Sequence, residues 1–199
     1  MPSPLILASA SVARRQLLEN AGLAFECVPA RVDETAIKAG LIAEAAPPRD
    51  VADILAEMKA RKVGTKRPDA LVIGCDQVLS FEGEIFDKPE SLEDARHQLR
   101  RLRGGRHQLL SAAVIWGEGK PLWRHVGVVR LQMRDFSDNY LEGYLERNWE
   151  SIRHSVGGYK LEEEGVRLFS IVQGDYFHVL GLPLLEILGY LGLRGDIEQ

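Results

Sequence analysis

Hydrophobic residues recur along the chain in two patterns, and each pattern predicts one type of element. Segments that are apolar throughout, or that alternate with polar residues, predict β-strands. Strands are therefore expected at Leu5 to Ala8, Phe25 to Val32, Ala70 to Phe81, His107 to Trp116, Leu122 to Met133 and Val166 to Gln173. The segment from Ala70 to Phe81 is long and apolar enough to be buried on both faces of a sheet.

Apolar residues spaced three and four positions apart predict helices between these strands. The helices are expected at Val12 to Ala21, Ala36 to Ile42, Asp50 to Val63, Leu92 to Leu102, Asp135 to Trp149 and Pro183 to Leu193. In the third helix the apolar stripe is Val51, Ile54, Leu55 and Met58. Lys59 lies one position past this stripe. The last helix carries leucines at ordinary core spacing, namely Leu184, Leu185, Leu188 and Leu191.

The order of the elements indicates an α/β fold. Strands and helices alternate at both ends of the chain, and a pair of antiparallel strands lies in the middle, joined by a turn between Gly117 and Pro121. No repeat, linker or low-complexity segment interrupts residues 1–199, so we predict one domain folded into two lobes. A ligand cleft between the lobes is the default expectation.

Composition narrows the class of protein. The chain has 199 residues, 45% of them hydrophobic, which is enough for a proper core. Its net charge of −4 argues against a binder of nucleic-acid polymers or of anionic membranes. Because no charged leader and no long apolar span is present, we expect a cytoplasmic protein without a membrane segment. Cys27 and Cys75 stand far apart, which predicts two buried, reduced thiols and no disulfide or structural zinc.

The first candidate site is the start of the first helix. The strand Leu5 to Ala8 leads into Ser9, Ser11, Arg14 and Arg15. Hydroxyl residues suit a helix cap, and the unpaired N–H groups there favour an anion. Cations in a first turn oppose the helix dipole, by about 0.3–1 kcal/mol each, so an anionic ligand is expected to compensate them. The alternative is a capped helix with solvated arginines.

Three ionisable residues form the second candidate group: Glu34 after the second strand, Lys59 beside a helix stripe, and Asp76 within the most apolar strand. A buried carboxylate needs a cation, donors or a metal ion in order to stay charged. Asp76 also fits a structural role, since the strand could end at Gly74 and leave Asp76 to cap a turn. Read alone, Glu34 and Lys59 are typical of a helix cap and a solvated side chain.

Taken together, these residues fit a phosphate-rich ligand. The basic residues Arg14, Arg15, Lys59 and Lys88 would neutralise a polyphosphate, and Glu34 and Asp76 would hold a divalent ion or activate water. Carboxylate oxygens suit Mg²⁺ or Mn²⁺. The five histidines show no metal-ligand spacing and are expected at the surface or in strands. Neither a Walker A nor a Gly-x-Ser-x-Gly pattern is present, which disfavours P-loop NTPases and α/β-hydrolases.

The motifs in their order resemble those of the Maf family of nucleoside triphosphate pyrophosphatases. The likeness runs from Leu5 to about Leu193. It is carried by LASASVARRQLL, VDE, LAEMKARKV, GCDQV, DKPES, LRGGRH, GGYKLEEEG and GDYFHVLGLPL. The resemblance implies an elongated mixed sheet with helices and a central cleft between two lobes. It also implies cleavage of a nucleoside triphosphate between the α and β phosphates, with a divalent cation, giving nucleoside monophosphate and pyrophosphate.

The resemblance also implies roles for individual residues. The phosphate contacts would be Ser9, Arg14, Arg15 and Lys88, and the catalytic group would be Glu34, Lys59 and Asp76. Asp76 would be the base that activates water, although a role as metal ligand stays open. A homodimer is also compatible with the family.

Two motifs are similar to the branch associated with 7-methyl-GTP rather than with pyrimidine triphosphates. Gln77 follows the aspartate, and an acidic residue stands in the later loop. A carboxylate only accepts hydrogen bonds, and a guanine edge offers N1–H and an amino group. We therefore expect Gln77 and Glu162, with Glu163 as the alternative, to contact the base. The competing hypotheses are a dTTP or UTP pyrophosphatase and a nucleotide-binding regulator of cell division or septum formation. A partner-binding scaffold is disfavoured by the core spacing of the last helix.

Overall fold

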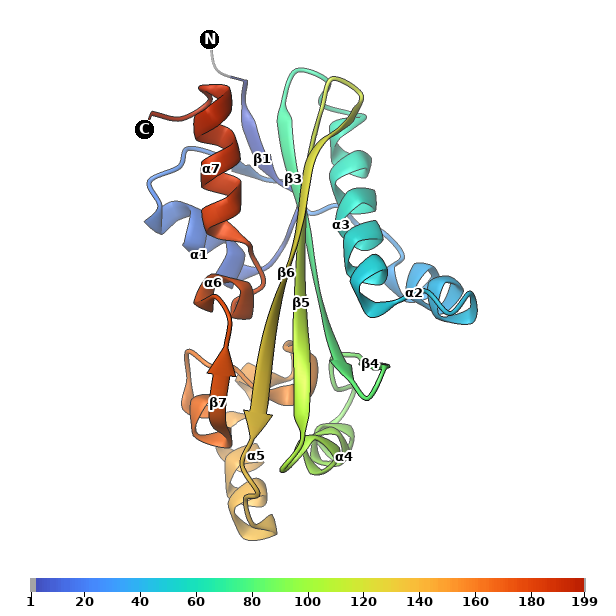
Figure 1. The fold of residues 1–199 in the computed structure, drawn as a ribbon, viewed down its shortest axis with the longest axis vertical. Helices are drawn as coiled ribbons and strands as arrows, with labels where there is room; N and C mark the ends of the chain where they lie inside the picture. Colours follow the sequence, from blue (N-terminus) through green and yellow to red (C-terminus); the bar gives the residue numbers. More distant parts are fainter. Residues whose placement is uncertain (1–2, 199) are drawn as a thin grey trace. The chain divides into compact units, whose positions relative to one another are not determined.

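The computed structural model describes residues 3–198, and within them one mixed sheet of seven strands carries the fold (Figure 1). In sheet order the strands are β2 (Glu26–Cys27), β1 (Leu5–Leu7), β3 (Leu71–Phe81), β5 (Arg106–Gly117), β6 (Lys120–Met133) and β7 (Phe169–Gln173). The short strand β4 (Glu84–Phe86) pairs with β3 outside this path. The predicted α/β class is therefore confirmed.

The chain divides into two compact units, as the two-lobe prediction expected. The first unit takes in the chain up to Gln77, residues 110–127, and the chain from Tyr176 onward. The second unit takes in residues 78–109 and 128–175.

The first unit has helices on both faces of its part of the sheet. Strand β1 pairs in parallel with β2 and with β3. On one face lie α1 (Val12–Asn20) and α7 (Leu184–Arg194), whose leucines share one buried cluster with residues of β1, β3 and β5. On the other face lies α3 (Pro48–Gly64), and α2 (Glu34–Ala43) packs against α3. Figure 1 shows α1 and α7 on one side of β1 and β3 and α3 on the other.

The alternation of side chains along β3 explains which residues meet which helices. Leu71, Ile73 and Cys75 belong to the buried cluster with α1 and α7. The residues between them point to the other face. On that face Gly74 lies so close to α3 that a Cβ there would be 2.2 Å from the Ala56 carbonyl oxygen. A side chain larger than hydrogen would therefore push α3 away from β3.

The second unit is built around α4 (Leu92–Leu102) and α5 (Asp138–Ile152), which pack against each other. Ser91 caps α4 by accepting a hydrogen bond from the Asp94 N–H. The Arg96 guanidinium binds both carboxylate oxygens of Glu142, at 2.7 and 2.8 Å, and joins the two helices. Short 3-10 turns, η1 (Val156–Gly158) and η2 (Glu164–Leu168), precede β7.

Each of the two hairpins has a two-residue turn, and the turn between β5 and β6 lies within the segment from Gly117 to Pro121 where the sequence predicted one. Glu118 and Gly119 connect β5 to β6 with positive φ angles of 54° and 77°. Glu82 and Gly83 connect β3 to β4 with φ angles of 52° and 84°. Two successive residues with positive φ are the signature of the turn whose twist matches that of paired strands.

Several expectations from the sequence were wrong. The predicted strand from Phe25 to Val32 is reduced to Glu26–Cys27, and Cys27 is exposed rather than buried. Residues 166–168 belong to η2, so the last strand begins only at Phe169. Leu185, which was placed in the core, is 55% exposed.

Lys59 and the histidines also differ from expectation. The buried stripe of α3 includes Leu55, Ala56, Lys59 and Ala60, so Lys59 lies within the stripe and not beyond it. His178 is buried and lies in the short helix α6 (Tyr176–Val179), rather than at the surface or in a strand. Within residues 3–198, none of the helices has the length and apolar character needed to cross a membrane.

Candidate active site

The centre of the candidate site is an ion-paired group in the first unit. The Lys59 Nζ donates a hydrogen bond to Asp76 Oδ1 at 2.7 Å and lies 3.0 Å from Glu34 Oε1. The Lys59 and Asp76 side chains are only 10% and 8% exposed, whereas Glu34 is about half exposed. The sequence predicted these three residues as one group, and the structure brings them together.

Local structure explains how each member reaches the group. Strand β3 continues through Asp76 to Phe81, so Asp76 lies within the strand and does not cap a turn at its exit. Its position, two residues beyond Gly74, directs its side chain to the face that α3 covers. On α3, Lys59 follows Leu55 by one helical turn on the buried stripe. Glu34 is the first residue of α2, whose N-cap Asp33 accepts a hydrogen bond from the Ala36 N–H.

The start of α1 forms a polar region beside the same strand. Ser11 caps α1, and the Ser9 Oγ accepts hydrogen bonds from the Ser11 N–H and from Arg14 Nη1. Arg14 also donates from Nη1 to the Cys75 carbonyl oxygen at 3.0 Å and from Nε to that of Gly181 at 2.8 Å. Arg14 is thus fixed against the residue that precedes Asp76. Among residues 3–198, the Arg14 Nη2 makes no hydrogen bond and stays available to a ligand.

The other two predicted phosphate contacts are less constrained. Arg15 is exposed and pairs with Glu19 one turn further along α1, at 3.3 Å. The Glu19 carboxylate and the hydrogen-bond acceptors around Arg14 therefore compensate the two positive charges near the start of the helix, so a ligand is not required for that purpose. Lys88 is exposed and belongs to the second unit.

Gln77, predicted to contact the base, has a structural role in the first unit. Its Nε2 lies 3.0 Å from the Ser111 Oγ, 3.0 Å from the His178 carbonyl oxygen and 2.9 Å from the Val179 carbonyl oxygen. Its side chain therefore points to the face of β3 opposite to Asp76, toward α6. The amide oxygen is the part of Gln77 that remains for a ligand.

The three consecutive glutamates of the second unit differ in their partners. Glu163 accepts hydrogen bonds from Ser151 and Lys160. Glu164 pairs with Arg147, whose hydrogen bond, together with that of Asn148, lowers the pKa of Glu164 to about 2. Glu162 is exposed and has no hydrogen bond or ion pair within the part of the chain that the structure describes. Glu162 is thus the member of this run that can bind a ligand without losing an internal contact.

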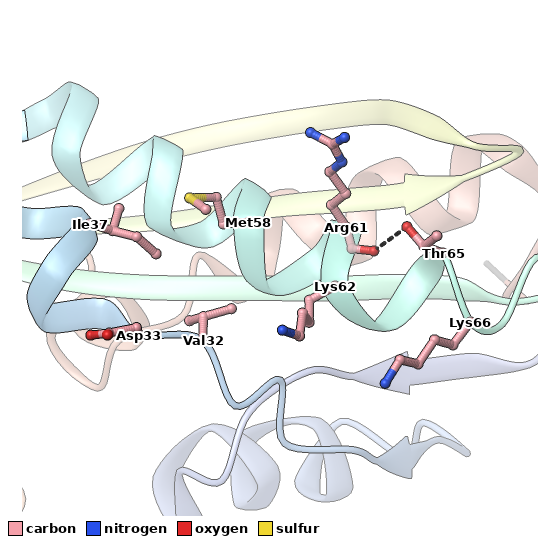
Figure 2. Close-up of a pocket in the computed structure, with 8 residues that line it drawn as sticks. All are labelled: Val32, Asp33, Ile37, Met58, Arg61, Lys62, Thr65 and Lys66. Carbon is pink, nitrogen blue, oxygen red and sulfur yellow. Dashed lines mark hydrogen bonds between the residues drawn. The ribbon is translucent and has the colours of Figure 1, made fainter. Parts of the chain in front are cut away.

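A pocket that the sequence did not predict lies between α3 and the segment that leads into α2. Its volume is about 440 Å³, and Figure 2 shows the eight residues that line it. Basic side chains from the last turns of α3 and the residues after it surround this pocket: Arg61, Lys62 and Lys66. Asp33 and Met58, the chain neighbours of Glu34 and Lys59, line it as well. The signal in the sequence was the cluster of basic residues at the end of the third predicted helix.

Comparison of the sequence with known proteins shows the family of the chain. The family model described as Maf-like protein matches residues 4–193. The chain is 63% identical to a nucleoside triphosphate pyrophosphatase of Ruegeria pomeroyi and 62% identical to one of Roseobacter denitrificans, in each case over 100% of both chains. It is 47% identical, again over 100% of both chains, to a 7-methyl-GTP pyrophosphatase of Mesorhizobium japonicum. With this match over almost its whole length, the chain belongs to the Maf family.

Proposed function

We propose that this protein is a nucleoside triphosphate pyrophosphatase, which hydrolyses the bond between the α and β phosphates. The observation that carries the proposal is the buried Lys59, held between the carboxylates of Asp76 and Glu34. Relatives at 61–63% identity over their full length bear the same name. Such a group provides both a base for water and a cation for phosphate oxygens, which a protein that only binds nucleotides does not require.

In the proposed reaction, a water oxygen forms a bond to the α phosphorus while the bond from that phosphorus to the bridging oxygen breaks. Pyrophosphate leaves, and Asp76 accepts the proton of the water. Lys59 holds the Asp76 carboxylate in place by its hydrogen bond. The Arg14 Nη2, the Ser9 hydroxyl, Arg15 and Lys88 are proposed to bind phosphate oxygens, where positive charge offsets the charge of the leaving pyrophosphate.

The donor set at the centre of the site fits a divalent cation. Glu34 and Asp76 each have a second carboxylate oxygen besides the one that contacts the Lys59 ammonium, and these oxygens come from two neighbouring elements. Hard ions such as Mg²⁺ and Mn²⁺ bind through one or two carboxylates together with phosphate oxygens and water. We propose that Glu34 holds the ion, together with Asp76 where Asp76 is a metal ligand instead of the base, and that the bound ion would polarise the phosphate oxygens.

For the base we propose a guanine-type nucleotide such as 7-methyl-GTP. Glu162 has acceptor oxygens only, which suits the N1–H and amino groups of guanine. Its exposed carboxylate makes no hydrogen bond or ion pair with residues 3–198, which supports it over Glu163. The amide oxygen of Gln77 is a second acceptor. The relative from Mesorhizobium japonicum is named for this substrate, whereas the more similar relatives are named for nucleoside triphosphates in general. A preference for dTTP or UTP is the competing substrate hypothesis.

The decisive experiment is a panel of triphosphates that includes 7-methyl-GTP, GTP, dTTP, UTP, CTP and ATP, with Mg²⁺ or Mn²⁺. Pyrophosphate and orthophosphate are measured separately, because only cleavage between the α and β phosphates gives pyrophosphate. Asp76→Asn is expected to abolish turnover while nucleotide binding persists, and Glu26→Gln, an exposed carboxylate of the same unit, serves as the matched control. Nucleotide binding without turnover by the native protein would favour the regulator hypothesis instead.

Substrate choice is tested in the same panel. Glu162→Gln is expected to reduce the preference for 7-methyl-GTP over dTTP, whereas Glu163→Gln is expected to leave it unchanged. The opposite result would move base recognition to Glu163, and no change in either variant would move it away from this loop. Size-exclusion chromatography of the same preparation tests the predicted homodimer.

A further inference from the structure

Two histidines and a glutamate that lie far apart in the sequence, none of them assigned to catalysis, meet in the first unit. His125 comes from β6, His178 from α6 and Glu186 from the first turn of α7. The potential ligand atoms of these three residues lie within 4.8 Å of one another. The spacing of the histidines along the chain gave no indication of this cluster.

The distances within the cluster suit a tetrahedral metal ion. The His178 Nε2 lies 3.1 Å from Glu186 Oε2, and the His125 Nε2 lies 3.5 Å from Glu186 Oε1. For zinc with ligand bonds of about 2.0–2.1 Å, two ligand atoms at the tetrahedral angle are about 3.3 Å apart. The separation between His178 Nε2 and Glu186 Oε2 is thus close to the edge of a zinc tetrahedron, while the His125 Nε2 lies beside the other oxygen of the same carboxylate.

The surrounding structure holds His178 firmly in this position. The His178 carbonyl oxygen accepts hydrogen bonds from the Ser111 Oγ at 2.6 Å and from Gln77 Nε2. Its imidazole packs against Gly127, where a Cβ would lie 2.0 Å from Nδ1. On the other side, the His125 ring stacks on Trp123 with an angle of 12° between the planes. Ligands fixed by their neighbours lose less freedom when an ion binds.

The exposure of the three side chains allows an ion to enter. The His178 side chain is 8% exposed, but those of His125 and Glu186 are 36% and 33% exposed. Imidazole nitrogens together with one carboxylate are the ligands of zinc sites that keep a fourth position open. The oxygen-only group of Glu34 and Asp76, by contrast, suits magnesium or manganese.

We propose that His125, His178 and Glu186 bind one divalent transition-metal ion of the zinc type, at a site distinct from the one proposed for the catalytic ion. The ion links β6 to α6 and α7 and leaves one coordination position for water. The site does not depend on the proposed enzymatic reaction, because only the geometry of its three side chains defines it.

The test uses the full chain after removal of metal with a chelator, with Mg²⁺ present to occupy the oxygen ligands. Zn²⁺ is titrated by calorimetry, and Co²⁺ is added as a spectroscopic probe, because tetrahedral Co²⁺ absorbs visible light. We expect one Zn²⁺ per chain and a tetrahedral Co²⁺ spectrum. His125→Gln and Glu186→Gln should each weaken Zn²⁺ binding at least 100-fold. His97→Gln, which changes an exposed histidine of α4, is the matched control and should bind as the native protein does.

A measurement on the native protein does not depend on the folding of the variants. In NMR spectra of the imidazole nitrogens, Zn²⁺ should shift the resonances of two of the five histidines, which assignment identifies as His125 and His178. Absence of Zn²⁺ binding, shifts at other histidines, or equal affinity in the native protein and both folded variants would overturn the proposal. Unchanged Zn²⁺ binding in Asp76→Asn would establish that the ion is not held by the catalytic carboxylates.

Discussion

Replacing Lys59 with methionine tests how the candidate site is held together. Methionine is similar to lysine in length but carries no charge, so the change removes the ammonium that lies 2.7 Å from Asp76 Oδ1. At this distance and an effective dielectric constant of about 20, the attraction between the two charges is about 6 kcal/mol before the cost of burial is subtracted. Removing one partner of a buried pair costs about 3–5 kcal/mol, since the remaining charge has no compensation.

The expected cost comes from leaving the buried Asp76 carboxylate without its positively charged partner. The Asp76 side chain is 8% exposed, and within residues 3–198 Lys59 is the residue that pairs with its carboxylate. Adding Asp76→Asn to Lys59→Met removes the uncompensated charge, so the double variant should be more stable than the sum of the two single changes implies. We expect a coupling energy of about 2 kcal/mol or more, in the upper part of the range for residues in contact.

The assay is urea unfolding of the native protein, both single variants and the double variant. The matched control is Arg67→Met, because Arg67 pairs with Glu26 at 2.9 Å but both side chains are more than one third exposed. That change should cost at most about 1 kcal/mol. A stabilising role of the buried pair is refuted if Lys59→Met lowers the free energy of unfolding no more than Arg67→Met does. It is also refuted if the effects of Lys59→Met and Asp76→Asn simply add, because the buried pair would then not stabilise the site.

Three further predictions concern other parts of the structure. Burial lowers the pKa of His107 from 6.5 to about 4, so the unfolded chain binds the proton first and stability should fall as pH drops from 6.5 to 4. Urea unfolding across this range should show a loss of about 3 kcal/mol that His107→Gln removes and His97→Gln does not. Gly74→Ala should lower the melting temperature sharply because its Cβ overlaps α3, whereas Gly40→Ala, with no atom within 4 Å of the added Cβ, should stabilise its helix by about 0.8–1 kcal/mol. Gln77→Leu should cost about 1–3 kcal/mol because its amide nitrogen donates to buried acceptors, and an unchanged melting temperature would contradict this role.

The sequence predicted best those elements whose signals are local. Helix α4 begins and ends at the predicted residues because Ser91 caps it and Gly104 and Gly105 follow it. The hairpin at Glu118 was predicted from its turn residues. The prediction of a strand from Phe25 to Val32 was wrong over most of its length. The apolar pattern fitted a strand, but only Glu26 and Cys27 pair with β1. Pairing partners are set by the whole sheet and are not visible in a short window of sequence.

The same limit applies to the site. The sequence grouped Glu34, Lys59 and Asp76 as ionisable residues that together fit a phosphate-rich ligand, but it could not show that Lys59 lies between the two carboxylates. That arrangement depends on the close approach of α3 to β3. The histidine cluster was missed because its members come from three elements that only the tertiary fold brings together.

The pleat of β3 connects the two sites. Successive residues of a strand point to opposite faces, so Asp76 faces α3 and Lys59 while Gln77 faces α6. Gln77 binds the carbonyl oxygen of His178, whose imidazole is part of the proposed zinc site. A shift of β3 by one residue would exchange these faces and disrupt both groups together. Gln77 thus connects the backbone of His178, a residue of the proposed zinc site, to the strand residue next to the proposed catalytic base, so Zn²⁺ bound at that site should stabilise the packing of α6 against β3.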